Sequence, residues 1–199
     1  MWVFNRLTTC CFPLSKFRRN MKKHRLFIAL NFSEKIKNRL FEFRDLWPEM
    51  PGRFVKKENL HLTLFFLGNM GDEEIAFLIE KLKKTAGKAT SFELKLTELC
   101  YAPKDKKPRM LWACGPAVEG LSKLKEEMEK ALGGEWYRRE KGTFQPHVTL
   151  VRLRRFDPSE LPEVKKKIDL TFPVDSFELM ESKLEKVGAE YRVLESFQL

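Results

Sequence analysis

The chain has 199 residues, of which 43% are hydrophobic and 33% are charged, and its 38 basic and 28 acidic residues give a formal net charge of +10. This length suits one domain or two closely joined lobes, with a core large enough to be stable without disulfides. No apolar segment approaches the roughly 20 residues that cross a bilayer, so we expect no membrane span. The positive charge suits an anionic partner such as RNA, although it is equally compatible with ordinary solubility.

The N-terminal segment differs from the rest of the chain. Residues 1–20 contain basic but no acidic side chains and show no clear amphipathic period. We expect them to be a disordered extension or an incorrectly assigned start, with Met21 as the natural first residue and residues 21–199 as a single domain.

The cysteines point to a reducing compartment. The chain contains four of them: Cys10, Cys11, Cys100 and Cys114. None has the CxxC spacing of a zinc site, so we expect reduced thiols in a cytoplasmic protein and no disulfide framework.

In chain order, the first half alternates strand and helix patterns. An apolar run predicts a strand at 25–30, Ser33 then begins a helix, and a second strand follows at 60–67. Asp72 is placed to cap a second helix, with acidic residues in its first turn and lysines in its last. Period-two alternation predicts a third strand at 92–96.

The second half repeats this order. A strand is predicted at 109–114, the helix after it ends at Gly133, and another strand covers about 146–152. A short helix after Pro158 and an alternating strand near 171–180 complete the set. The recurrence predicts an internal duplication of two α+β lobes about a pseudo-two-fold axis, followed by a terminal hairpin.

Two similar motifs lie on the second strand of each half, "NLHLTLFFLG" at 59–68 and "PHVTLVRL" at 146–153. Alternate residues of a strand share a face, so His61 and Thr63 point to the same side and His147 and Thr149 do likewise. A lone strand histidine is more often structural than catalytic. Two matching motifs among only three histidines make a shared functional role the better interpretation.

Two imidazoles and two hydroxyls suit phosphoryl transfer. One histidine would take a proton from the attacking oxygen and the other would give one to the leaving oxygen. The hydroxyls of Thr63 and Thr149 would donate hydrogen bonds to the phosphate oxygens, and Arg152 would balance their charge. At strict period two Arg152 points away from His147, so this role requires a bulge or strand end after Thr149, and otherwise Arg152 is a surface charge.

Other chemistries have less support in the sequence. It contains no phosphate-binding GxxxxGK[ST] loop, no HExxH metal motif and no GxSxG nucleophile motif. His24 has no threonine partner and is expected to be a surface residue. Period two places Phe65 on the side of His61, where it would stack on a terminal base or pack between the lobes.

The paired motifs resemble the H-x-T-x-x-F-L-G and H-x-T-x-x-R motifs of the two-histidine phosphoesterases, specifically the RNA 2′,3′-cyclic phosphodiesterases, also called 2′-5′ RNA ligases. The resemblance extends from about Lys22 to Leu199. It implies an α+β fold with two lobes, two antiparallel sheets related by pseudo-two-fold symmetry, helices on the outer faces and a central active-site groove.

The resemblance also implies an activity. Members of this family open a terminal 2′,3′-cyclic phosphate of RNA to a 2′-phosphomonoester without metal or nucleotide cofactor. By analogy His147 would be the general base and His61 the general acid, although the sequence is compatible with the exchanged roles. Weak, reversible 2′-5′ ligation would need no further machinery.

We therefore expect a monomeric enzyme that needs no cofactor and acts on RNA with a 2′,3′-cyclic phosphate end, tRNA fragments among them. Two alternatives stay open. One is a phosphodiesterase for small cyclic nucleotides, which substrate profiling would separate. The other is an RNA-binding module without turnover, which the presence of both His-x-Thr pairs disfavours.

Overall fold

The computed structural model describes residues 22–104, 106–136, 144–154, 156–157, 159, 161–164, 167–185 and 188–199. The expectations for residues 1–20 and for a start at Met21 lie outside these residues. The short helix predicted after Pro158 lies largely outside them as well.

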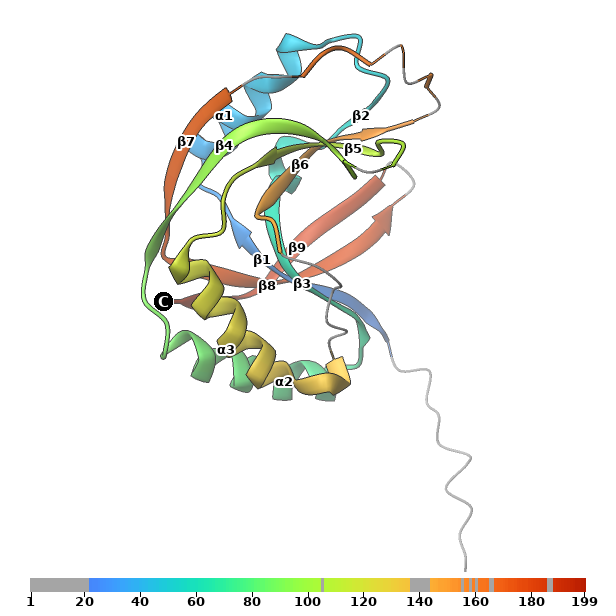
Figure 1. Ribbon diagram of the computed structural model, residues 1–199. Coiled ribbons are helices and arrows are strands. Elements are labelled where there is room, and N and C mark those ends of the chain that lie inside the picture. Colours follow the sequence, from blue (N-terminus) through green and yellow to red (C-terminus); the bar gives the residue numbers. More distant parts are fainter. Residues whose placement is uncertain are drawn as a thin grey trace, which may run out of the picture.

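The described residues form two antiparallel sheets (Figure 1). The four-stranded sheet has the order β3-β1-β8-β9, and the five-stranded sheet has the order β2-β6-β5-β4-β7. The strands are β1 (His24–Asn31), β2 (Gly52–Phe54), β3 (His61–Met70), β4 (Phe92–Ala102), β5 (Met110–Cys114), β6 (His147–Leu153), β7 (Lys167–Val174), β8 (Ser176–Glu185) and β9 (Gly188–Gln198). The helices are α1 (Glu34–Glu42), α2 (Asp72–Ala86) and α3 (Glu119–Trp136), and short 3₁₀ turns cover Phe43–Leu46 and Lys57–Asn59.

The helices lie against different sheets. Helix α1 lies beside the five-stranded sheet, where Leu40 lines one small cavity together with Leu111 of β5 and Leu150 of β6. Helices α2 and α3 lie side by side against the four-stranded sheet, in contact with β9 and β3 (Figure 1). This arrangement confirms the predicted α+β class with two antiparallel sheets. None of the helices in the described ranges is long and apolar enough to cross a bilayer.

The last strand of each half crosses to the other half's sheet. Strand β4 belongs to the first half in sequence but pairs with β5, and β8 belongs to the second half but pairs with β1. The strands β3-β1-β8 of one sheet therefore correspond to β6-β5-β4 of the other, whereas the edge strands β9 and β7 both come from the second half. The correspondence of these three strands agrees with the predicted duplication, which stays a prediction together with its pseudo-two-fold axis.

Several predicted boundaries differ from the structure. The strand predicted near 171–180 is two strands in different sheets, because the apolar alternation that ends at Val174 resumes out of step at Phe177, with Asp175 between the strands. Helix α2 is capped at Gly71 and not at Asp72, because the Gly71 N–H donates to the Glu74 carboxylate at 2.7 Å. The predicted helix end at Gly133 is present as a break: Gly133 has a non-helical φ of 64°, and a short helical segment follows it to Trp136.

Candidate active site

The first motif begins strand β3. His61 and Thr63 are partly exposed, whereas Leu62 and Leu64 are buried in the core, as the alternation predicts. The pairing with β1 then skips Leu64, since Ala29 lies opposite Thr63 and Ile28 opposite Phe65. Leu64 is therefore the extra residue of a bulge directly after Thr63. We call the side of each sheet that carries its His-x-Thr motif the histidine face.

The second motif begins strand β6 and repeats this geometry. His147 and Thr149 are partly exposed and Val148 is buried. The pairing with β5 skips Leu150, because Trp112 lies opposite Thr149 and Leu111 opposite Val151.

This second bulge determines where Arg152 points. Leu150 and Val151 are both buried, and the exposed Arg152 returns to the histidine face. The bulge that the assignment of Arg152 required is thus present after Thr149.

A hydrogen bond from outside the strand ladder supports each bulge. The Nζ of Lys125, on α3, donates to the Leu64 carbonyl at 2.9 Å, and the ammonium lies 3.8 Å from the centre of the Phe65 ring. The backbone N–H of Val55 donates to the Leu150 carbonyl at 2.8 Å. Both carbonyls that the bulges remove from regular pairing therefore have donors, which stabilises the irregular backbone.

Each catalytic candidate is oriented by a backbone carbonyl two residues before it. The Nδ1 of His61 lies 2.7 Å from the Asn59 carbonyl oxygen, and the Nδ1 of His147 lies 2.9 Å from that of Gln145. A carbonyl can only accept, so Nδ1 carries the proton and donates in both residues. Proton transfer then falls to the Nε2 atoms, and that of His61 lies 3.1 Å from the Thr63 hydroxyl.

Aromatic rings fix the two imidazoles further. The His61 ring lies 5.0 Å from the rings of both Phe27 and Tyr191, and the His147 ring stacks on Trp112 at 3.8 Å. These three aromatic residues were not among the predicted site residues. The strand that contains Trp112 was predicted from the sequence. The strand register, which places Trp112 opposite Thr149, could not be predicted.

The two motifs lie close enough together for groups of the second motif to influence the pKa of His61 in the first. Strands β3 and β6 are in contact although they belong to different sheets. The pKa of His61 is lowered to about 4, mainly by burial, while its bond to the Asn59 carbonyl opposes the shift. Electrostatic interactions with Arg152, His147 and Lys37 lower it further. His61 is therefore neutral at pH 7 in the free protein, and both motifs share one cationic environment.

One predicted neighbour of His61 is on the wrong side. Phe65 is 1% exposed and packs in the core, because the bulge at Leu64 reverses the alternation. Strict alternation places Phe66 in the core with Leu62 and Leu64, and this prediction is wrong for the same reason. Phe66 lies on the histidine face, where it is 60% exposed and 6.4 Å from the ring of Phe27. Phe66 thus occupies in β3 the position that Arg152 occupies in β6, five residues after the histidine.

His24 is not the surface residue that was expected. Its side chain is 13% exposed, and its Nδ1 lies 2.6 Å from a carboxylate oxygen of the buried Glu181. His24 is covered because it lies at the start of β1, near the N-terminus of α2. Its Nε2 lies 3.2 Å from the carboxylate of Asp72, the first residue of that helix. His24 has no part in the site.

In the described part of the chain, one cluster of possible metal ligands is present: Glu98, Cys100 and Cys114, whose ligand atoms lie within 4.8 Å of one another. Neither His61 nor His147 belongs to it. Both cysteines are free thiols, as expected, but the sequence did not predict that they would be neighbours.

Comparison with known proteins places these features in a family. The model of the 2′-5′ RNA ligase superfamily matches residues 32–185, which contain both motifs. The RNA 2′,3′-cyclic phosphodiesterase of Thermotoga maritima is 30% identical over 179 residues, which are 85% of this chain and 92% of the relative. That of Thermus thermophilus is 32% identical over 186 residues, 88% of this chain and 90% of the relative.

A solved structure agrees with these sequence matches. The crystal structure of the protein TT0787 of Thermus thermophilus superposes with a TM-score of 0.77 at 32% identity, covering 88% of this chain and 97% of that one. The chain is therefore an enzyme of the 2′-5′ RNA ligase superfamily.

Proposed function

We propose that the protein hydrolyses the terminal 2′,3′-cyclic phosphate of RNA to a 2′-phosphomonoester by two-histidine acid-base catalysis without a cofactor. The observation that carries the proposal is the matched pair of His-x-Thr strands, each with the Nδ1 of its histidine tied to a backbone carbonyl. The names of the relatives in Thermotoga and Thermus and the net charge of +10 support RNA as the substrate.

In the proposed reaction, His147 takes a proton from water through Nε2 as the water oxygen attacks phosphorus. The bond from phosphorus to the 3′ oxygen breaks, and His61 gives that oxygen a proton. The hydroxyls of Thr63 and Thr149 and the guanidinium of Arg152 stabilise the charge on the non-bridging oxygens.

The neutral state of His61 in the free protein bears directly on its role as acid. The positive charges of Arg152 and Lys37 contribute to its lowered pKa, and a bound phosphate anion would offset them. Substrate binding therefore raises the pKa of His61 and favours the protonated form that the leaving oxygen requires. Ligation is the same displacement with a 5′-hydroxyl of RNA in place of water: that oxygen attacks phosphorus, and the 3′ oxygen leaves with a proton from His61.

The decisive experiment is hydrolysis of a short RNA with a 2′,3′-cyclic phosphate end in the presence of EDTA. Wild type is expected to yield only the 2′-phosphate. His61→Ala and His147→Ala are each expected to lose about 10²- to 10⁴-fold in rate, the usual contribution of a positioned acid or base. Conversion that survives either substitution would overturn the mechanism. A faster reaction with 2′,3′-cyclic mononucleotides than with RNA would instead favour the small-nucleotide alternative.

A substrate with sulfur at the bridging 3′ position separates the two roles. A thiolate leaves without protonation, so this substrate does not need the general acid. His61→Ala should recover most of its lost rate on the sulfur substrate, whereas His147→Ala should not. Recovery in His147→Ala alone would show that the roles are exchanged.

A further inference from the structure

Cys100 and Cys114 meet on the histidine face of the five-stranded sheet. Cys100 lies opposite Trp112 in the pairing of β4 with β5, and Cys114 is two residues beyond Trp112 on the same side of the strand. Cys114 in turn lies opposite His147 in β6. The two thiols are therefore diagonal neighbours across β4 and β5, and one of them is the cross-strand partner of a catalytic candidate.

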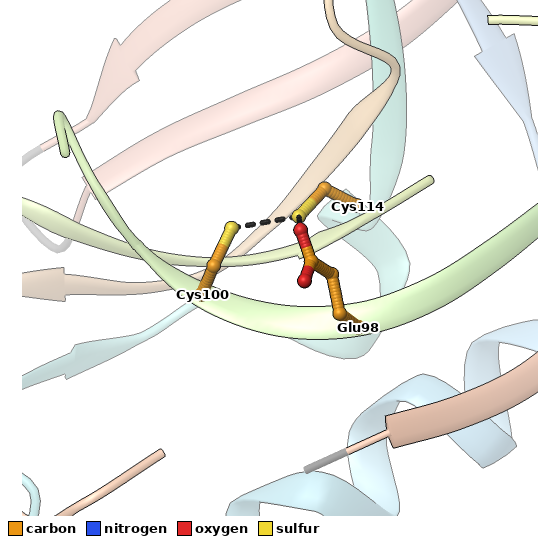
Figure 2. A group of neighbouring side chains, drawn as sticks. All are labelled: Glu98, Cys100 and Cys114. Carbon is orange, nitrogen blue, oxygen red and sulfur yellow. Dashed lines mark hydrogen bonds between the residues drawn. The ribbon is translucent and has the colours of Figure 1, made fainter. Parts of the chain in front are cut away.

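The sulfur atoms point toward one another (Figure 2). Their separation is 2.6 Å. A disulfide bond is about 2.05 Å long, whereas two thiolates on one tetrahedral zinc ion lie roughly 3.8 Å apart. The two sulfur atoms therefore lie closer together than two ligands of one zinc ion would, and they are within reach of each other for a disulfide, with Glu98 beside the pair.

We propose that Cys100 and Cys114 form a redox pair, which a peroxide converts reversibly into an intramolecular disulfide that reduces activity at the neighbouring histidine. The effect on activity rests on the proposed function, whereas disulfide formation does not. The two thiols lie 14 positions apart in a chain without CxxC spacing, so only the strand register brings them together.

The two thiols are suited to different steps. Cys100 is partly exposed, and the hydrogen bond from Cys114, with a contribution from Lys104, lowers its pKa. Cys114 is buried, and the pKa of its thiol is raised, chiefly by the hydrogen bond to Cys100 and by burial. Cys100 is thus the thiol that peroxide reaches and that ionises more readily.

The reaction balances in two steps. The Cys100 thiolate attacks one oxygen of hydrogen peroxide, the O–O bond breaks, and the departing hydroxide takes up a proton to give water and a sulfenic acid. The Cys114 sulfur then attacks the Cys100 sulfur, and the hydroxyl leaves as water with the proton of Cys114. The Glu98 carboxylate, 3.6 Å from the Cys114 sulfur, accepts that proton on the way.

Trp112 connects the two cysteines to the candidate active site. This residue lies opposite Cys100, and its indole stacks on His147 at 3.8 Å. Drawing the two sulfurs into a bond changes the local spacing of β4 and β5 at Trp112. We expect the His147 ring to be displaced with it, so that the oxidised protein hydrolyses the cyclic phosphate more slowly.

The test uses the full chain with Cys10→Ser and Cys11→Ser, which leaves only the proposed pair. After treatment with hydrogen peroxide, the mass without reductant should fall by two hydrogen atoms, a Cys100–Cys114 cross-linked peptide should appear, and dithiothreitol should reverse both changes. An unchanged mass, a sulfinic acid at Cys100 without the cross-link, or a disulfide between two copies would overturn the proposal.

Single substitutions in that background separate the steps. With Cys114→Ser, Cys100 should accumulate as a sulfenic acid that dimedone captures. With Cys100→Ser, Cys114 should resist peroxide. Circular dichroism establishes that each variant is folded, and the mass measurement on the parent protein does not depend on them.

Activity is then measured on the reduced and oxidised forms. The oxidised form should be slower, dithiothreitol should restore the rate, and Cys100→Ser should be insensitive to peroxide. Equal rates of the two forms would overturn the link to the site. Failure of the reduced protein to hydrolyse any cyclic phosphate would concern the proposed function alone, because the disulfide is detected by mass.

Discussion

The surroundings of His61 determine both which ring nitrogen carries its proton and how far its pKa is lowered. Its Nδ1 donates to the Asn59 carbonyl, while burial and neighbouring positive groups lower its pKa to about 4. Proton NMR of the free protein should therefore show one histidine that titrates near pH 4. Binding of a nucleoside 2′-phosphate should raise that pKa, since the anion offsets the charges of Arg152 and Lys37.

The chain has only three histidines, so the spectrum of His61→Ala identifies the signal by its absence. A His61 that titrates near its ordinary value in the free protein would contradict the burial argument. A pKa that does not move when the ligand binds would contradict the role of the phosphate.

Phe65 and Phe66 offer a matched pair of substitutions one residue apart. Phe66 is exposed on the histidine face, so Phe66→Ala should leave stability nearly unchanged and raise KM for RNA about 5- to 150-fold, as expected for one lost base stack of about 1–3 kcal/mol. Phe65 is buried, so Phe65→Ala should lower the free energy of unfolding by about 3–5 kcal/mol. Urea unfolding and steady-state kinetics measure the two effects. An unchanged KM in Phe66→Ala would exclude stacking at this position.

At the scale of elements, the bulge after Thr63 depends on a side chain from another part of the fold. Lys125→Met keeps the apolar stem but removes the ammonium that donates to the Leu64 carbonyl. Loss of a charged hydrogen bond to a buried group should cost about 1.5–3 kcal/mol in stability, measured by urea unfolding. We also expect a lower rate of hydrolysis, because the bulge sets the direction of the residues after Thr63.

Lys130→Met on the same helix is the control. Lys130 is exposed and pairs with Glu127 at the surface, so its loss should leave both stability and rate nearly unchanged. Equal losses in the two variants would show that the Leu64 hydrogen bond is not important for the bulge.

The bulges also explain which side-chain directions could not be predicted from the sequence. Alternation correctly predicted that His61 and Thr63 share a face with Leu62 and Leu64 behind them. It failed at Phe65, because the donor to the Leu64 carbonyl lies 61 positions away in α3 and leaves no trace in the local pattern. The bulge in β6 was not predicted either. The sequence indicated only that Arg152 could reach the site if a bulge followed Thr149.

At the scale of the whole molecule, the site depends on contact between two sheets. The recurrence of motifs predicted that two His-x-Thr strands would come together, and β3 and β6 are in contact. The sequence did not predict that β4 and β8 exchange sheets, because each pairs with strands of the other half through long-range register. Alternation identifies a strand, whereas partner choice depends on the complete set of strands.

The burial of His61 also makes the stability of the whole fold depend on pH. In the unfolded chain the imidazole has its ordinary pKa near 6.5, and in the folded protein its pKa is about 4. As the pH falls below about 6.5, the unfolded chain takes up a proton that the folded chain does not, so stability decreases. The loss from this group is complete below about pH 4, and the difference in pKa limits it to about 3 kcal/mol.

Urea unfolding at pH 7 and at about pH 4.5 tests this dependence. His61→Gln cannot titrate, so between these conditions it should lose about 1–3 kcal/mol less stability than wild type. Thr149→Val, on the other sheet, leaves the His61 imidazole in place and should follow the wild-type curve. If His61→Gln and wild type lose stability equally on acidification, His61 is not buried in its neutral form, and the pKa argument for its place in catalysis fails with it.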